Sequence, residues 1–495
     1  MNKEGYIPKE QRKKILLLCD DIRFTSGIAT IAREMVVGTS HKFNWVNVGG
    51  AINHPEAGQR LDISADTNTH NGIEDASVFI YPTNGYGDPQ MLRQLLEIEK
   101  PDSIMFFTDP RYWGWLFQME NEIRSKIPMI YLNIWDDYPA PMYNESFYES
   151  CDGLMAISKQ TLNINKLVLG DKIKDKVLSY VPHGINKDIF FPIDDSDPVK
   201  SKELSDFKKY LFGDKEYDFV LGFNSRNIRR KSVPDTLAAF KTFLDMLPKE
   251  KADKCAFVLH TQPVDEHGTD LYAVRDMLFT DEQISQIYFS DQRLPSHVMN
   301  LLYNTVDAVA LLSSNEGWGL SLTEAMMCGK PIIANVTGGM QDQMRFEDAN
   351  GKWIEFDSKF CSNHFGTYRK HGSWAFPVFP SNLSLQGSVA TPYIFDDRAD
   401  FRDAAAQILE VYALKTNQVE EFGSHTRGFE TYDELSKAAR EWVTSDESGM
   451  SANKMCDNIV NHVNEVFNTF KPRKSFELIK TEPIKRKHIR HQLVY

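Results

Sequence analysis

The chain has 495 residues with a formal net charge of −13 at pH 7, and 42% of the residues are hydrophobic and 25% charged. This composition is typical of a globular protein and excludes extensive disorder, the length suits two domains, and the negative charge argues against nucleic-acid binding over the whole surface. The six cysteines form no CxxC pair, and we find neither an apolar run of membrane-spanning length nor an export signal, so we expect a cytoplasmic protein with reduced thiols.

The first predicted element is a buried parallel strand over residues 14–19, KILLLC. It leads through Ser26 and Gly27 into a helix predicted over residues 28–37, so Gly27 stands at a helix N-terminus, where free backbone amides favour anions. Helical segments then alternate with strands predicted over residues 78–81, 103–108 and 129–134. This alternation is typical of a doubly wound parallel sheet.

Acidic residues follow two of these strands. Asp109 comes directly after the strand over 103–108, and Trp135-Asp136-Asp137-Tyr138 comes after the strand over 129–134. Ligands bind at the carboxyl ends of strands in open parallel sheets, so both loops are candidate functional loops. Asp109 is a candidate catalytic residue or a solvated turn residue, and the aromatic loop either contacts an acceptor or packs inside the domain.

The most specific stretch of the chain is residues 309–341. An apolar strand over 309–312 leads into a loop and a helix with Glu324, and a second strand is predicted over 331–334. Glycines allow a backbone to approach a ligand closely, and two carboxylates eight residues apart can accept hydrogen bonds from a polyhydroxylated ligand. The loop residues are Glu316, Gly317, Trp318, Gly319 and Leu320.

This stretch closely resembles the donor-site signature of retaining GT-B glycosyltransferases of family four. There, a Glu, seven further residues and a second Glu enclose a glycine-aromatic-glycine-leucine loop. The resemblance implies an α/β fold with two Rossmann-like domains facing each other across a cleft, and a C-terminal helix that crosses back to the first domain. It also implies transfer of a hexosyl or pentosyl group from a nucleotide-diphosphate sugar to an acceptor with retention of configuration, without a metal or other cofactor.

The same resemblance implies roles for single residues. The first Glu and the loop amides hold the transferred sugar, the second Glu holds the ribose, and a cation pair holds the diphosphate across from the glycine loop of the first domain. Ser225 and Ser232 stand where the family favours glycine. The implied donor-site residues are Gly27, Arg226, Lys231, Glu316, Gly317, Trp318, Gly319, Leu320 and Glu324, and the implied catalytic residues are Glu316, Arg226, Lys231 and Asp109.

We predict three parts of the chain. Residues 1–183 form an acceptor domain, residues 184–450 form the donor domain with an insertion at about 341–395, and residues 451–495 form the crossing helix and a basic tail. The boundary rests on the segment Tyr180 to Asn186, which resembles the family's passage between its domains. The insertion either rims the cleft or makes an oligomer contact.

The acceptor, the nucleotide and the sugar stay open at this level. A saccharide or a lipid-linked sugar is one kind of acceptor. The basic tail from residue 471 favours DNA, as in phage enzymes that glycosylate hydroxymethylated bases, or is a solvated chain end. A second alternative is a non-catalytic member that keeps the fold and binds a sugar nucleotide. The two glutamates and the two cations argue against it.

Overall fold

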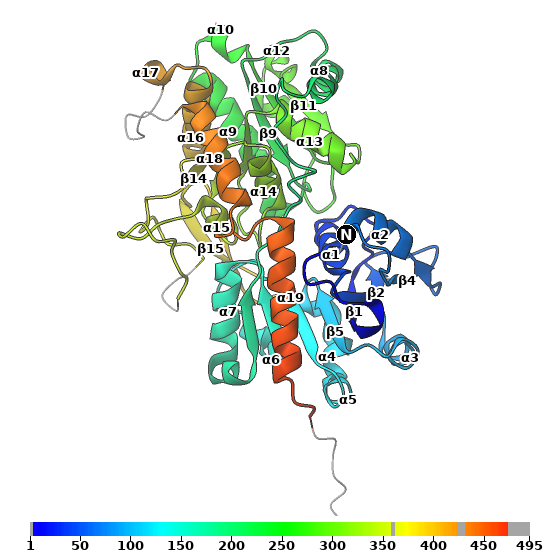
Figure 1. The fold of residues 1–495 in the computed structure, drawn as a ribbon. Coiled ribbons are helices and arrows are strands. Elements are labelled where there is room, and N and C mark those ends of the chain that lie inside the picture. Colours follow the sequence, from blue (N-terminus) through cyan, green and yellow to red (C-terminus); the bar gives the residue numbers. More distant parts are fainter. Residues whose placement is uncertain (1–2, 358–361, 423–430, 474–495) are drawn as a thin grey trace, which may run out of the picture.

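The computed structural model describes residues 3–357, 362–422 and 431–473, and it is built around two parallel sheets (Figure 1). The blue to cyan part of the chain forms the first sheet, and the green to yellow part forms the second. Helices cover both sheets. This arrangement confirms the predicted α/β fold with two Rossmann-like domains.

The first sheet has eight strands in the order β3-β4-β2-β1-β5-β6-β7-β8, and β3 is the antiparallel member. Ile15, Leu17 and Cys19 of β1 belong to one buried cluster, whereas Leu16 and Leu18 belong to another. Because both faces are buried, the sequence of this strand is an unbroken apolar run. The strands are β1 (Lys13–Asp20), β2 (Phe43–Gly50), β3 (Leu61–Asp62), β4 (Val78–Pro82), β5 (Ser103–Phe107), β6 (Met129–Asn133), β7 (Gly153–Ala156) and β8 (Val177–Tyr180).

The helices that follow these strands begin at residues suited to the first turn. Ser26 accepts a hydrogen bond from the Ala29 amide at the start of α1, and Ser158 accepts one from the Thr161 amide at the start of α7. The helices of this half are α1 (Gly27–Thr39), α2 (Ser64–Asn71), α3 (Pro89–Glu99), α4 (Gly114–Gln118), α5 (Glu120–Arg124), α6 (Glu145–Glu149) and α7 (Lys159–Leu169).

The second sheet has six parallel strands in the order β11-β10-β9-β12-β13-β14. Its last strand lies inside the range of about 341–395 that we predicted as an insertion, so this range contributes a strand to the second sheet. The strand is short and contains Pro377, which is tolerated at a sheet edge and weakens the strand signal in the sequence. The strands are β9 (Phe219–Asn224), β10 (Cys255–His260), β11 (Ile287–Ser290), β12 (Ala308–Leu311), β13 (Ile332–Asn335) and β14 (Ala375–Val378).

An antiparallel hairpin follows β14 and consists of β15 (Asn382–Gln386) and β16 (Ile394–Arg398). In the described ranges, no helix is long and apolar enough to span a bilayer. The helices of the second half up to the hairpin are α8 (Pro198–Phe212), α9 (Val233–Asp245), α10 (Lys249–Ala252), α11 (Leu271–Leu278), α12 (Asp281–Ile284), α13 (Ser296–Thr305), α14 (Leu320–Met327) and α15 (Met340–Met344). After the hairpin come α16 (Phe401–Lys415), α17 (Val419–Phe422), α18 (Tyr432–Thr444) and α19 (Ala452–Thr469).

The chain passes between the domains twice at one place. The Ile185 amide donates to the Met450 carbonyl at 3.0 Å, and the Ala452 amide donates to the Ile185 carbonyl at 3.0 Å. Gly184 has to be glycine there, because a Cβ atom would collide with the backbone of Ser451. Helix α19 then packs on the first domain beside α1, β7 and β8 (Figure 1), as predicted for the crossing helix.

Candidate active site

The predicted loop lies at the carboxyl end of β12, where the chain turns into α14. Gly319 has a φ of +87° and caps α14 in the left-handed conformation that glycine adopts easily. The Gly339 amide donates to the Glu316 carbonyl at 3.0 Å, and a Cβ atom on Gly338 would collide with the same carbonyl oxygen. The turn after β13 therefore packs directly against the backbone of Glu316. This close approach leaves no room for a side chain at Gly338.

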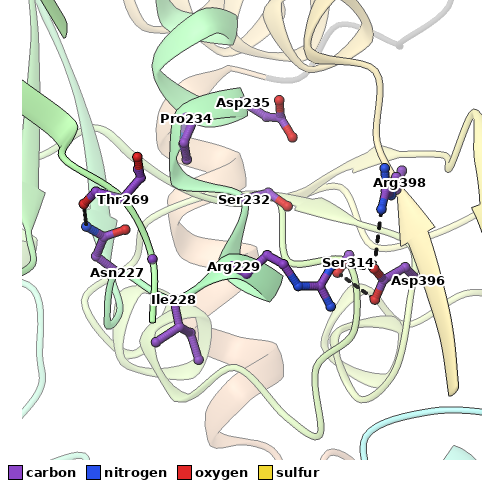
Figure 2. Close-up of a pocket in the computed structure, with 11 residues that line it drawn as sticks. Asn227, Ile228, Arg229, Ser232, Pro234, Asp235, Thr269, Ser314, Asp396 and Arg398 are labelled. Carbon is purple, nitrogen blue, oxygen red and sulfur yellow. Dashed lines mark hydrogen bonds and ion pairs between the residues drawn. The ribbon is translucent and has the colours of Figure 1, made fainter. Parts of the chain in front are cut away.

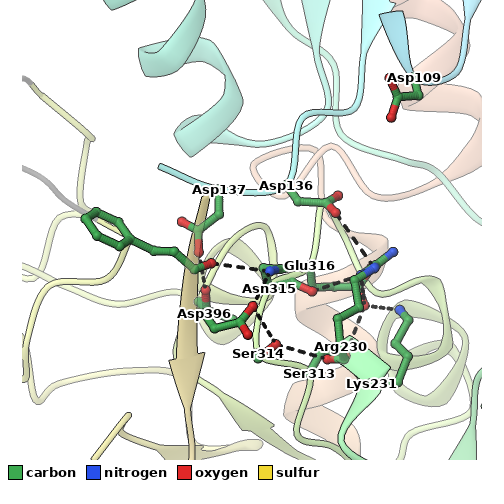
Figure 3. A network of polar contacts seen from close by, with 12 residues as sticks. Asp109, Asp136, Asp137, Arg230, Lys231, Ser313, Ser314, Asn315, Glu316 and Asp396 are labelled. Carbon is green, nitrogen blue, oxygen red and sulfur yellow. Dashed lines mark hydrogen bonds and ion pairs between the residues drawn. The ribbon is translucent and has the colours of Figure 1, made fainter. Parts of the chain in front are cut away.

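Glu316 is the centre of this loop and only 6% of its surface is exposed (Figure 3). Its Oε2 atom forms an ion pair with Lys231, lies 3.4 Å from Arg230 Nη1 and accepts a hydrogen bond from Ser313 Oγ at 3.1 Å. Burial alone would raise the pKa of Glu316, but the charges of Lys231 and Arg230 outweigh burial and hold the pKa at about 2. Glu316 is therefore a carboxylate at neutral pH and acts as a hydrogen-bond acceptor.

Both cations come from the turn between β9 and α9. A short 3₁₀ turn over Arg229–Lys231 ends at Ser232, which has a φ of +49° at the position where the family favours glycine. Arg230 Nη1 also donates to the Asn315 carbonyl at 2.9 Å, which fixes the guanidinium beside the loop. Burial lowers the pKa of Lys231, and Glu316 opposes this effect. The site thus holds a buried ammonium group and a half-buried guanidinium group beside one buried carboxylate.

Arg226, which we predicted as the partner of Lys231, points elsewhere. Its Nε atom donates to Asp265 Oδ2 at 2.8 Å, and 59% of the side chain is exposed. Arg230 lies beside Glu316 instead. The five-residue spacing of the motif is present, but the 3₁₀ turn decides which side chains face the loop, and sequence spacing does not encode that direction.

Glu324 lies on α14 with a separate set of partners. Tyr303 Oη donates to Glu324 Oε2 at 2.5 Å, and Asn224 Nδ2 donates to Tyr303 Oη at 2.7 Å. Burial raises the pKa of Glu324 to about 7, although the Tyr303 hydrogen bond lowers it. The two predicted glutamates thus have different electrostatic surroundings: Glu316 lies next to cations, whereas Glu324 bonds to the neutral Tyr303 hydroxyl and burial dominates its pKa.

The first domain closes directly against this loop. A Cβ atom on Gly27 would stand 3.2 Å from Leu320 Cδ1, and one on Gly317 would stand 2.8 Å from the Ile134 carbonyl oxygen. Both values are at or below the closest ordinary contacts of a Cβ atom. The predicted glycine loop at Gly27 and the loop over 316–320 therefore face each other across the domain boundary.

Asp136 is the acidic residue of the first domain that faces Glu316 and its cations. Its Oδ2 atom lies 3.8 Å from Arg230 Nε, and burial raises the pKa of Asp136 while Arg230 opposes the rise. The aromatic neighbours pack instead: Trp135 is buried and its indole donates to the Asp137 carbonyl at 2.8 Å, and Tyr138 is buried. The aromatic residues of this loop therefore pack inside the domain, whereas Asp136 faces the candidate site.

Two further predicted residues have local roles. Asp109 caps a 3₁₀ turn by accepting from the Arg111 amide at 2.9 Å, and it forms an ion pair with the same arginine; in Figure 3 it stands apart from the Glu316 network. Trp318 is 2% exposed and its indole donates to Thr323 Oγ1 at 2.9 Å. Its ring belongs to the core, so only its backbone is available to a ligand.

Residues 283–359 match the family model described as glycosyl transferases group 1. The chain is 30% identical over 179 residues to D-inositol 3-phosphate glycosyltransferase of Corynebacterium jeikeium, which covers 36% of the chain and 40% of that relative. It is 24% identical over 274 residues to mannosylfructose-phosphate synthase of Agrobacterium fabrum, which covers 49% of the chain and 56% of that relative. The matches thus span about half the length of these curated relatives or less.

The fold is similar to that of solved glycosyltransferases. Anabaena HepE in complex with UDP and glucose superimposes with a TM-score of 0.57 at 13% identity, covering 92% of this chain and all of that one. Sucrose-phosphate synthase from Thermosynechococcus elongatus superimposes with a TM-score of 0.58 at 14% identity, with 92% and 100% covered. The chain resembles the group 1 glycosyl transferases and has their GT-B fold.

The match to the group 1 family covers only part of the candidate site. It includes Glu316 and Glu324 but neither the cation turn with Arg230 and Lys231 nor the first domain. Sequence reasoning also missed Arg230, for which the run of three basic residues at 229–231 was a usable signal. It further missed Asp396, which accepts a hydrogen bond from Asn315 Nδ2 at 3.0 Å, directly before Glu316, and for which the sequence holds no short-range signal. Contacts in the structure, and not a sequence motif, place Arg230 and Asp396 at the candidate site.

Proposed function

We propose that the chain is a glycosyltransferase that moves a sugar from a nucleotide-diphosphate sugar to a saccharide acceptor, with retention of anomeric configuration. The observation that carries the proposal is the buried Glu316 carboxylate, paired with Lys231 and Arg230 at the carboxyl edge of the second sheet. Sugar-nucleotide donors need acceptors for their hydroxyl groups and fixed positive charge for their phosphates, and this cluster supplies both.

Each part of the donor has a proposed partner. The transferred sugar bonds to Glu316 and to the amides of the loop over 317–320, and the ribose hydroxyls bond to Glu324. The diphosphate lies beside Lys231 and Arg230, opposite the N-terminus of α1 at Gly27, where backbone amides favour an anion. Breaking the bond between the anomeric carbon and the phosphate oxygen builds negative charge on the leaving diphosphate, and preorganised cations stabilise that charge without a metal.

The acceptor side is proposed to take a small saccharide. The names of the curated relatives include D-inositol 3-phosphate and mannosylfructose-phosphate, both built on small polyhydroxylated units. DNA is disfavoured, since the chain has a formal net charge of −13 at pH 7 and would repel the phosphates over most of its surface. The basic tail that suggested DNA falls mostly in residues 474–495, outside the described residues. The non-catalytic alternative also binds a sugar nucleotide, so the hydrolysis assay below separates it from a transferase.

A panel of UDP-, GDP- and ADP-sugars tests the donor assignment, beginning with UDP-glucose because it is named in a solved relative of the same fold. Binding to the folded state raises the melting temperature, so thermal shift identifies the nucleotide without an acceptor. Slow hydrolysis of the same donor then reports the chemistry. We expect sugars of one nucleotide class to raise the melting temperature of the wild-type protein. Glu316→Gln should abolish hydrolysis of that nucleotide sugar. A chain that responds to none of the panel contradicts the proposal.

A further inference from the structure

The strand β16 belongs to the hairpin after β14. Through Asp396 it contacts the loop over residues 313–320, which carries Glu316 and is called the donor loop below. This carboxylate is 1% exposed and has three donors (Figures 2 and 3). Oδ1 accepts from Ser314 Oγ at 3.2 Å and from Asn315 Nδ2 at 3.0 Å, and Oδ2 accepts from Arg229 Nη1 at 2.9 Å. Asp396 thus binds the two residues that directly precede Glu316, and also the turn that carries the cations.

The backbone of β16 reinforces this contact. The Asp397 amide donates to the Ser314 carbonyl at 2.8 Å, and Asn315 Nδ2 donates to the Phe395 carbonyl at 3.3 Å. The segment Ser314-Asn315 is therefore held by side-chain and main-chain bonds from one strand. Since Glu316 follows immediately, its position depends on these bonds.

The same strand is bonded to the first domain. The Phe395 amide donates to the Tyr138 carbonyl at 2.7 Å, and Tyr143 Oη donates to the Tyr393 carbonyl at 3.0 Å. In an antiparallel pair, alternate residues turn their backbone groups away from the partner strand. On β16 the outward amides of Phe395 and Asp397 meet different domains, so one strand edge connects the first-domain loop with the donor loop.

A cavity of about 310 Å³ borders Asp396 on its other side (Figure 2). Arg398 lies in the same lining, with Nη2 3.7 Å from Asp396 Oδ2 and 53% of its side chain exposed. Shortening Asp396 enlarges an existing space, and thermal unfolding of the variant checks that the fold tolerates the change. Arg398 carries charge at the same place without a described bond to the donor loop, which makes it a matched control.

We propose that Asp396 is a positioning residue for Glu316, and that β16 couples closure of the two domains to the geometry of the donor loop. The inference rests on the proposed function, since it concerns the reaction at Glu316. Asp396 acts through Ser314 and Asn315. When the first domain moves away, the bonds from Phe395 and Tyr393 release the strand, and the loop loses its fixed geometry.

The test compares Asp396→Ala, Asp396→Asn and Arg398→Gln with wild type, using the nucleotide sugar that the panel identifies. Misplacing a catalytic group by about 1 Å can cost up to roughly 10²-fold in rate, so we expect Asp396→Ala to lower kcat roughly 10-fold or more. Free-nucleotide affinity should fall less than kcat does, because the ribose is assigned to Glu324, which has no described bond to β16. Asp396→Asn keeps an oxygen for Ser314 and Asn315 and should recover part of the loss, and Arg398→Gln should match wild type.

A double-mutant cycle tests the coupling. Tyr143→Phe removes the hydroxyl that donates to the hairpin and leaves Asp396 intact. We expect it to lower kcat by about 2- to 5-fold alone, and to have less effect in the Asp396→Ala background, because both changes act on one strand. Additive effects would overturn the coupling. A normal kcat in Asp396→Ala would overturn the positioning role, and so would equal losses of kcat in Asp396→Ala and Arg398→Gln. In either case, turnover by the wild-type protein would leave the proposed function standing. A wild-type chain without donor binding or hydrolysis would overturn both.

Discussion

Replacing Lys231 with alanine removes the closest cation of Glu316 and leaves Arg230 at 3.4 Å from the same oxygen. In the intact site the pKa of Glu316 falls from 4.5 to about 2 in spite of burial, a shift equivalent to roughly 3 kcal/mol. Since Lys231 is the larger of the two attractive charges, most of that stabilisation should disappear. We expect turnover to fall roughly 10²-fold or more, because the same ammonium is proposed to neutralise the leaving diphosphate.

The folded-state pKa of Glu316 is depressed, so its contribution to stability is present above pH 4.5 and is lost as the pH falls toward 2. The Lys231→Ala variant should therefore lose less stability over this acid range than wild type does, and be less stable at pH 7. Urea unfolding at several pH values measures both quantities, and steady-state assays with the identified donor separate kcat from KM.

Lys241→Ala is the matched control for this prediction. Lys241 lies on α9 and forms an ion pair with Asp245, whose side chain is 58% exposed, four residues along the same helix. Its removal should change neither turnover nor acid stability measurably, because exposed pairs of this kind contribute little. Turnover of Lys231→Ala within about threefold of wild type, with normal folding, would refute the assignment of Lys231 to the leaving group.

Three further predictions concern the rest of the site. Burial raises the pKa of Glu324 to about 7, and its carboxylate is a better acceptor for ribose hydroxyls than the protonated acid. Free-nucleotide affinity should therefore rise between pH 6 and 8 in wild type and stay constant in Glu324→Gln. Calorimetry that shows no pH dependence in wild type would contradict this. Arg230→Ala should lower kcat more than Arg226→Ala, since only the former lies beside Glu316, and the reverse order in steady-state assays would favour the sequence motif over the geometry. Gly27→Ala should raise the KM for the donor severalfold, because the added Cβ atom meets the opposite domain. Gly114→Ala, also at a helix start but with open space around it, should leave the KM unchanged. Equal KM values for the two variants would show that the domains need not close this tightly.

The sequence predicted the elements whose signals are local. The apolar run of residues 14–19 predicted a central strand, because a strand buried on both faces needs apolar residues throughout. The loop at Glu316 was predicted because its glycines and carboxylates have the spacing of a known family motif. The direction of Arg226 was not predictable, because a single turn decides whether a guanidinium meets Asp265 or Glu316. Asp396 lies 80 residues beyond Glu316 along the chain and meets its loop only through tertiary packing, which leaves no short-range pattern.

The crossing helix has a consequence for how the chain acquires its structure. The first sheet is complete within residues 13–180, yet the surface between α1 and β8 is covered by α19, formed by Ala452–Thr469. Buried positions on α19 such as Ile459 and Val463 belong to the same core cluster as Met35 of α1. On the ribosome, residues 13–180 emerge long before α19 is synthesised, and the growing chain meanwhile exposes that apolar surface to water. The domain made first is thus the last to be finished, and a fragment that ends before α19 should aggregate rather than fold independently.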